Sequence, residues 1–100
     1  MKNRIDACFE KLKAENKKAL VTFITAGDPD MVTTEKCILE MYKNGSDIIE
    51  IGVPFSDPIA EGATIQKASL RSLSGGTNLD KIFDLVRKLR TQTDKPMLLM

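Results

Sequence analysis

The stretch DIIEIGVPFSDPIAEG, residues 47–62, decides the fold. Its first six residues form a short apolar run that is interrupted by one glutamate, Glu50, and such a run predicts a strand. Two prolines and a glycine in residues 53–62 then indicate a shaped loop rather than a regular element. The stretch therefore predicts a strand that ends in a long irregular loop.

Strands and amphipathic helices alternate on both sides of this stretch. Residues Ala19 to Thr25 are nearly continuously apolar and β-branched, as expected of a strand buried on both faces of a parallel sheet. Residues Pro96 to Met100 begin a third strand. Helices are predicted from the cap Asn3 to about residue 15, from Asp30 to Asn44, from Ala63 to Leu73, and from a cap at Thr77 or Asn78 to Leu89.

The apolar periodicity of these helices predicts which of their residues face the core. They are Ile5, Cys8, Phe9 and Leu12 in the first helix, Val32, Ile38, Leu39, Met41 and Tyr42 in the second, and Leu79, Ile82, Phe83, Val86 and Leu89 in the last. Strands that alternate with helices pair in parallel through right-handed crossovers. The sequence thus predicts an α/β protein, either a barrel or a doubly wound sheet, formed by residues 1–100 as one domain.

Charge and cysteine usage restrict the function. Fifteen basic and fourteen acidic residues give a net charge of +1, and their interspersion argues against nucleic acid or an anionic membrane as a partner. Cys8 and Cys37 form no CxxC motif, and without histidine they predict no zinc site. We expect both to be small core residues of a reduced, cytoplasmic protein, since no apolar run has signal or membrane-spanning length.

The lack of histidine also limits the chemistry of this stretch. It excludes Ser-His-Asp and Cys-His arrangements, so acid–base work falls to carboxylates, lysines or Tyr42. Ligands of parallel α/β proteins bind at the carboxyl ends of the strands, where Glu50 stands out. If Glu50 faces inward, desolvation should raise its pKa toward neutrality; alternatively it is solvated or paired with a lysine. For Glu61 and Asp28 a structural role at a turn or helix start is the simpler interpretation.

Residues 50–66, EIGVPFSDPIAEGATIQ, resemble the signature of tryptophan synthase α subunits, in which a glutamate on strand 2 leads into a G-V-P-F-S-D-P-x-A-D-G-P-x-I-Q loop. Residues 23–29, FITAGDP, are similar to the end of the family's first strand, and residues 96–100, PMLLM, to its third. The resemblance covers essentially the whole chain. It implies the N-terminal part of a (β/α)₈ TIM barrel, with three parallel strands and flanking helices.

The resemblance also implies a reaction and its residues. The family cleaves indole-3-glycerol phosphate to indole and glyceraldehyde 3-phosphate without a cofactor, and the indole passes to a β subunit that carries pyridoxal phosphate in an α2β2 heterotetramer. By this resemblance Glu50 is the general acid–base and Glu61 the second carboxylate. The positions that line the indole pocket are Phe23, Ile65 and Met100, and those that contact the β subunit lie in the loop from Pro54 through Asp57 to Pro58.

Two features depart from the family pattern. Glu61 stands where the family has aspartate, and Ala63 where it has proline. The chain also ends in the third strand, before the phosphate-binding loops that follow strands 7 and 8 of such barrels. We therefore expect the 100 residues alone to be inactive. Alternatives are a non-catalytic module that docks on the β subunit, and another phosphate-binding barrel enzyme.

Overall fold

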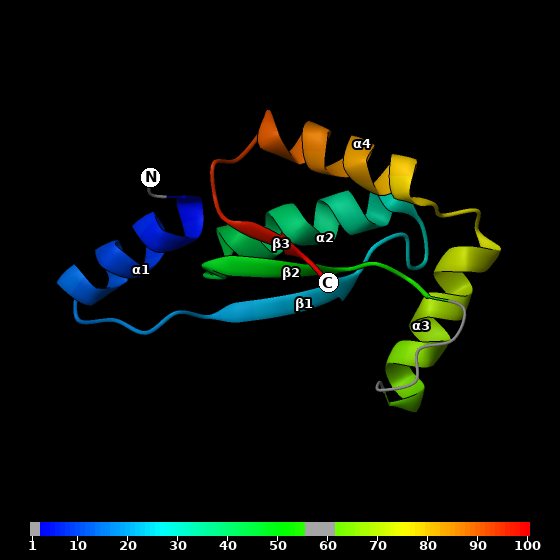
Figure 1. Ribbon diagram of the computed structural model, residues 1–100, viewed down its shortest axis with the longest axis horizontal. Helices are drawn as coiled ribbons and strands as arrows, with labels where there is room; N and C mark the ends of the chain where they lie inside the picture. The colour runs from blue at the N-terminus through cyan, green and yellow to red at the C-terminus, as the bar shows by residue number, and fades with distance from the viewer. Residues whose placement is uncertain (1–2, 56–61) are drawn as a thin grey trace.

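The computed structural model describes residues 3–55 and 62–100 as a layer of helices against a small parallel sheet (Figure 1). The elements, in chain order, are α1 (Arg4–Ala14), β1 (Val21–Thr25), α2 (Met31–Lys43), β2 (Ile48–Gly52), α3 (Ala63–Ser74), α4 (Leu79–Arg90) and β3 (Met97–Leu99). This order confirms the predicted alternation of helices and strands. None of the helices in the described ranges is long and apolar enough to cross a membrane.

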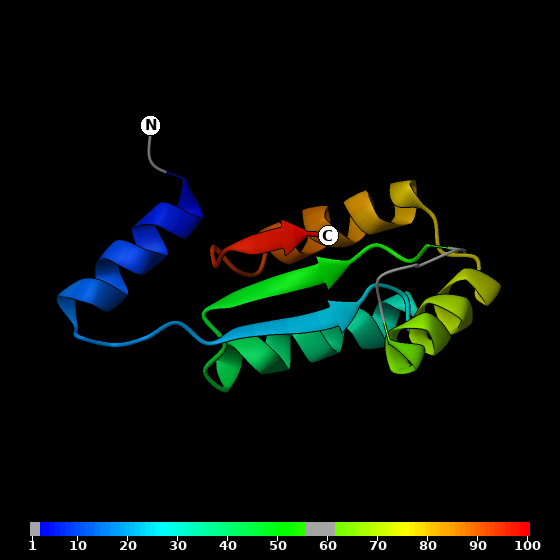
Figure 2. The same cartoon turned by 60° about the horizontal axis from the view of Figure 1, so that its bottom comes forward.

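The sheet has the order β1-β2-β3, and both neighbouring pairs are parallel. Helices α2 and α4 lie side by side and cover one face of the sheet, whereas α3 stands beyond the carboxyl ends of the strands (Figures 1 and 2). The chain thus crosses over through helices between parallel strands, as the sequence predicted.

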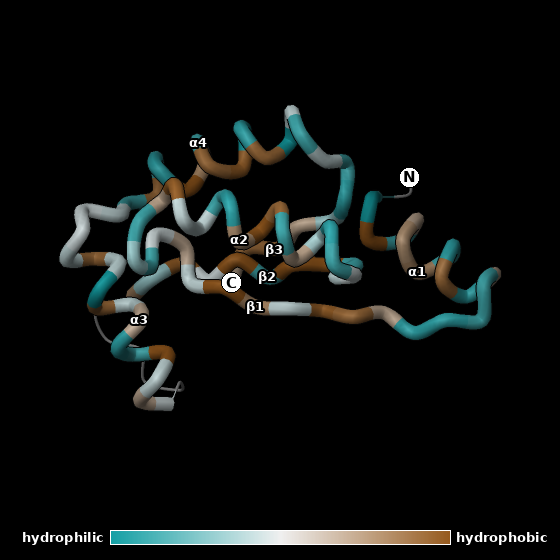
Figure 3. The backbone as a smooth tube through the Cα atoms, turned by 180° about the vertical axis from the view of Figure 1, so that it is seen from behind, coloured by the Kyte–Doolittle hydropathy of each residue, from teal (hydrophilic) through white to brown (hydrophobic). Residues whose placement is uncertain are grey.

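The core forms between the sheet and these two covering helices. Hydrophobic residues run along the strands and recur along α2 and α4 (Figure 3). The buried cluster consists of Ala26, Ile38, Tyr42, Ile49, Ile51, Ile82, Leu85 and Leu89. Because successive side chains of a strand point to opposite faces, the burial of Ile49 and Ile51 against the helices directs Glu50 to the other face.

Polar capping side chains explain where α1, α2 and α4 begin. Asn3, Asp30 and Asn78 each accept a hydrogen bond from the backbone N–H three residues later, at 2.8, 2.7 and 2.9 Å. The bond from the Thr33 N–H lowers the pKa of Asp30. The cap of α4 is thus Asn78 rather than Thr77.

Some residues predicted to face the core are exposed instead. Phe9, Val32, Leu79 and Phe83 are 48%, 63%, 54% and 49% exposed. In α4 the buried stripe is Ile82, Leu85 and Leu89, and Phe83 lies about 100° around the helix from Ile82. The helices therefore bury a narrower stripe than their apolar residues alone suggest.

Two further predictions about burial were wrong. Cys37 is exposed and Cys8 only partly buried, so the cysteines are not both core residues. Strand β1 is not buried on both faces, since Val21 and Phe23 are 44% and 39% exposed. The reason is that α2 and α4 cover the sheet on one side only.

Tyr42 joins the covering layer to the third strand. Its side chain is buried in the core, and its hydroxyl donates a hydrogen bond to the carbonyl oxygen of Pro96, just before β3. Ile49 N–H donates to the same oxygen at 3.3 Å. Burial raises the pKa of Tyr42 from 10.0 to about 12. The phenol is therefore a neutral, structural donor, not an acid–base group.

Replacing Tyr42 with phenylalanine should destabilise the protein by roughly 1 kcal/mol near neutral pH, because one of the two hydrogen bonds to Pro96 is lost. An unfolded tyrosine ionises near pH 10, whereas the folded one stays neutral until about pH 12. The contribution of Tyr42 is thus complete below pH 10 and declines between pH 10 and 12. Urea unfolding of both proteins across this range measures it; a stability difference that grows with pH contradicts this account.

Candidate functional site

The sheet face opposite α2 and α4 carries the candidate catalytic residue. We call this surface the open face; it consists of Val21, Phe23, Glu50, Leu98 and Met100. Phe23, Glu50 and Leu98 are paired in register across β1, β2 and β3. Glu50 is the only residue of β2 that is not buried. The carboxyl group therefore stands between apolar neighbours on both adjacent strands, and the structure gives it no lysine partner among the ion pairs that it shows.

Phe23 lies against Gly52 at the carboxyl end of β2. A Cβ atom at Gly52 would stand 2.4 Å from Cζ and 2.8 Å from Cε2 of the Phe23 ring. The ring therefore occupies the space that a side chain at residue 52 would take. This places an aromatic surface beside Glu50.

Met100 continues the ladder between the second and third strands. Its N–H donates to the Ile51 carbonyl at 3.0 Å, and its own carbonyl accepts from the Val53 N–H at 2.7 Å. Alternation from Leu98 places the Met100 side chain on the open face, where it is 57% exposed. Phe23, Glu50 and Met100 therefore share one face near the carboxyl ends of the strands.

The remaining predicted site residues belong to the segment after β2. Pro54 is buried directly after the strand. Ile65 lies in the first turn of α3 and is partly buried. Asp57, Pro58 and Glu61 lie outside the described residues. The geometry therefore describes one of the two candidate carboxylates, Glu50.

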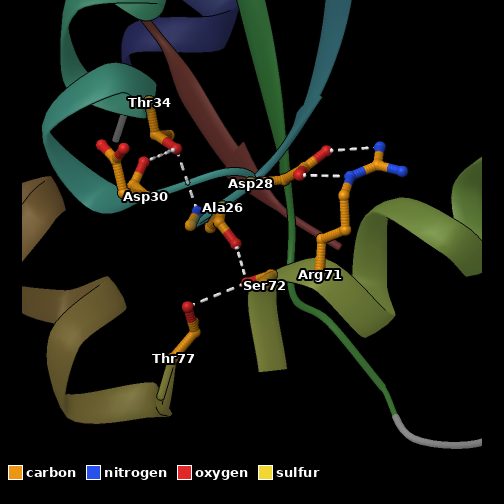
Figure 4. A network of polar contacts seen from close by, with 8 residues as sticks. Ala26, Asp28, Asp30, Thr34, Arg71, Ser72 and Thr77 are labelled. Carbon is orange, nitrogen blue, oxygen red and sulfur yellow. Dashed lines mark hydrogen bonds and ion pairs between the residues drawn. The ribbon is translucent and has the colours of Figure 1, made fainter. Parts of the chain in front are cut away.

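A polar network that sequence reasoning missed fixes α3 to the loop after β1 (Figure 4). The Arg71 guanidinium donates two hydrogen bonds to Asp28, with Nε 2.8 Å from Oδ1 and Nη2 3.0 Å from Oδ2. The Ser72 hydroxyl donates to the Ala26 carbonyl and lies 2.8 Å from the Thr77 hydroxyl. Asp28 raises the pKa of Arg71. Because Asp28 and Arg71 are far apart in sequence, no periodic pattern could have revealed the pair.

Gly27 allows this network to close. Its φ of +81° favours glycine, and a Cβ there would stand 2.1 Å from the Thr77 hydroxyl and 2.6 Å from the Ser72 hydroxyl. The Gly27 N–H donates to Thr34 Oγ1 at 3.0 Å, and the Thr34 hydroxyl donates in turn to the Asp30 carbonyl. The loop after β1 is thus fixed to both α2 and α3.

The parallel strands and the crossover helices define an α/β protein, the class that contains barrels and doubly wound sheets. The family model for the tryptophan synthase alpha chain matches residues 9–100. The chain belongs to this family. A solved structure of tryptophan synthase subunit alpha from Legionella pneumophila str. Paris superposes with a TM-score of 0.97 at 44% identity, over 100% of this chain and 38% of that one.

Two further relatives agree with this assignment. The tryptophan synthase alpha chain of Geotalea uraniireducens is 59% identical over 98% of this chain and 37% of its own length. The tryptophan synthase complex from Pyrococcus furiosus contains a chain with a TM-score of 0.78 and 40% identity, over 82% of this chain and 34% of that one. The chain thus spans well under half the length of the proteins that it matches, and it forms part of a TIM barrel.

We predict that Gly52→Ala displaces the Phe23 ring and costs about 1–3 kcal/mol of stability, as overpacking typically does. Combining it with Phe23→Leu, which removes both contacting ring atoms, should make the alanine much less costly. Gly62→Ala is the matched control, because nothing lies within 4 Å of a Cβ there. Denaturant unfolding of the parent, Gly52→Ala, Phe23→Leu, the double variant and Gly62→Ala gives the stabilities, and an equal cost of Gly52→Ala with phenylalanine or leucine at 23 refutes the steric account.

Proposed function

We propose that this chain is the N-terminal part of a tryptophan synthase α subunit that cleaves indole-3-glycerol phosphate to indole and glyceraldehyde 3-phosphate in the cytoplasm. The observation that carries the proposal is the position of Glu50, a carboxyl group on the open face beside an aromatic ring and at the strand ends where barrel enzymes bind substrate. Family membership supports the same reaction.

Glu50 acts in this proposal as the general acid–base. Its carboxyl group gives a proton to the indole ring carbon that carries the glycerol chain, and it manages the proton of the hydroxyl on the adjacent carbon. As that hydroxyl becomes a carbonyl, the carbon–carbon bond breaks and its electrons remain with the indole. A single carboxyl group can serve both steps if it exchanges protons between them. The cleavage needs no cofactor.

The apolar surroundings of Glu50 suit an aromatic substrate. Phe23 and Met100 share its face of the sheet, and Ile65 lies in the first turn of the helix beyond the strand ends. Burying an indole against such side chains supplies binding energy and orients the ring toward the carboxyl group. Glu61 is assigned as the second carboxylate, which stabilises charge at the indole nitrogen.

The proposed partner is a tryptophan synthase β subunit, which binds pyridoxal phosphate and forms an α2β2 heterotetramer with this subunit. The Pyrococcus furiosus relative is described as a complex, which supports such assembly. The contact is assigned to the loop that starts at Pro54 and contains Asp57 and Pro58. The α reaction itself draws on the residues of the barrel alone.

Glu50→Gln tests the proposal in a complete barrel that begins with these 100 residues. Glutamine keeps the size and hydrogen bonding of the side chain but removes proton transfer, so turnover should fall about 10²–10⁴-fold while substrate affinity is kept. Glu35→Gln is the control, because Glu35 lies in α2, across the sheet from Glu50, and accepts a hydrogen bond from Gln92. Steady-state kinetics with indole-3-glycerol phosphate measure both. Undiminished turnover in Glu50→Gln would remove the acid–base assignment.

The same assay separates the enzyme from the docking module. A complete barrel that stimulates the β subunit but never cleaves indole-3-glycerol phosphate, even with glutamate at position 50, is the non-catalytic module. A barrel that cleaves the substrate and loses this activity in Glu50→Gln is the enzyme.

Asp57→Ala tests the assigned docking loop. Removing a carboxylate from the contact should weaken activation of the β subunit more than it weakens substrate binding. Titrating the β subunit with each variant gives the first quantity, and KM for indole-3-glycerol phosphate gives the second. An equal loss in both contradicts the docking assignment.

A further inference from the structure

The buried residues of helix α3 lie in its second half. Its buried residues are Ala68, Ser69 and Ser72, whereas residues 62–67 are exposed or partly buried. Unlike α2 and α4, it covers no face of the sheet but stands across the carboxyl ends of the strands (Figures 1 and 2). Contacts near its C-terminal end therefore help to set its orientation.

Those contacts hold both the position and the direction of the helix. The Ser72 hydroxyl fixes one point, the Ala26 carbonyl at the end of β1. The Arg71–Asp28 pair adds two nearly parallel hydrogen bonds of 2.8 and 3.0 Å, and such a bidentate geometry restricts rotation as well as distance. Figure 4 shows Arg71 reaching along the side of Asp28 that faces away from Thr34.

A small rotation at this attachment displaces the other end of the helix. At about 1.5 Å per residue, Ile65 lies about 9 Å along the axis from Arg71, so a tilt of about 10° moves it by roughly 1.6 Å. A misplacement of about 1 Å at a substrate contact can change catalysis by up to about 10²-fold. The tilt of α3 that Arg71 sets should therefore affect the binding of any ligand that Ile65 contacts.

We propose that Arg71 and Asp28 are positioning residues: together they set where the N-terminal half of α3, with Ile65, stands over the carboxyl ends of the strands, and so tune substrate affinity. This inference rests on the proposed function, because it takes the substrate pocket to include Ile65. Glu50 is held by β2 instead, so the pair acts on binding more than on proton transfer.

The pair lies partly in solvent. The Arg71 side chain is 57% exposed and the Asp28 side chain 17%, and ion pairs that reach the surface contribute modestly to stability. A more exposed ion pair offers a comparison: Arg87 and Asp84 on α4 are 2.9 Å apart, lie within one helix and have side chains 78% and 63% exposed. If both pairs served only stability, removing either one should leave KM unchanged.

The test compares Arg71→Met, Arg71→Lys, Asp28→Asn and Arg87→Met in the complete barrel. We expect Arg71→Met and Asp28→Asn to raise KM for indole-3-glycerol phosphate about 3–10-fold with kcat changed less than twofold, and the double variant to be no worse than either. Arg71→Lys keeps the charge but not the paired hydrogen bonds, so its KM should lie between. Arg87→Met should leave KM unchanged.

A second readout is independent of turnover. Amide hydrogen exchange should rise in residues 63–70 of the Arg71→Met protein, relative to residues 79–90, and should not change in Arg87→Met. Unchanged exchange in residues 63–70, or a KM equal to that of Arg87→Met, overturns the positioning role. A parent protein without turnover refutes the proposed function instead, and the exchange measurement then still decides whether the pair positions α3.

Discussion

The packing of Ile49 and Ile51 against α2 and α4 is the constraint on which the other features depend. Once these two side chains are buried against the helices, the alternation of side chains along a strand places Glu50 on the opposite face of the sheet. A shift of one residue in the pairing of β2 would bury the carboxylate among aliphatic side chains and expose both isoleucines. Both changes would lower the stability of the fold. The hydrophobic core thus fixes the direction of the candidate acid–base group.

The loop after β1 connects the core to helix α3 beyond the carboxyl ends of the strands. Ala26 is fully buried under the helices, so its carbonyl is a rigid acceptor for Ser72, and Gly27 admits the hydroxyls of Ser72 and Thr77 without a clash. Asp28 then holds Arg71. The short polar loop after β1 thus positions helix α3, which itself makes little contact with the core.

Local sequence patterns predicted most of the fold, but they could not predict polar contacts between residues that are far apart in the sequence. The alternation around Glu50, the capping residues Asn3 and Asp30, and the order of strands and helices follow from the identities of near neighbours. The Asp28–Arg71 pair joins residues that are 43 positions apart in the sequence, and nothing local distinguishes Arg71 from a solvated surface charge. Periodicity likewise overestimated the burial of Phe83, because it shows where apolar residues lie on a helix but not whether another element covers them.

The open face combines exposed apolar side chains with a carboxyl group. Phe23, Leu98 and Met100 are 39%, 42% and 57% exposed around a carboxyl group that no cation neutralises among the ion pairs of the described residues. In relatives that are more than twice as long, further strands continue the sheet around this side. Under the proposed function, the same side chains would become the wall of an enclosed space, where apolar burial would bind an aromatic ring and exclude water from the proton transfer. The 100 residues would then supply the acid–base group and one wall of the pocket, and the rest of the barrel would supply its enclosure.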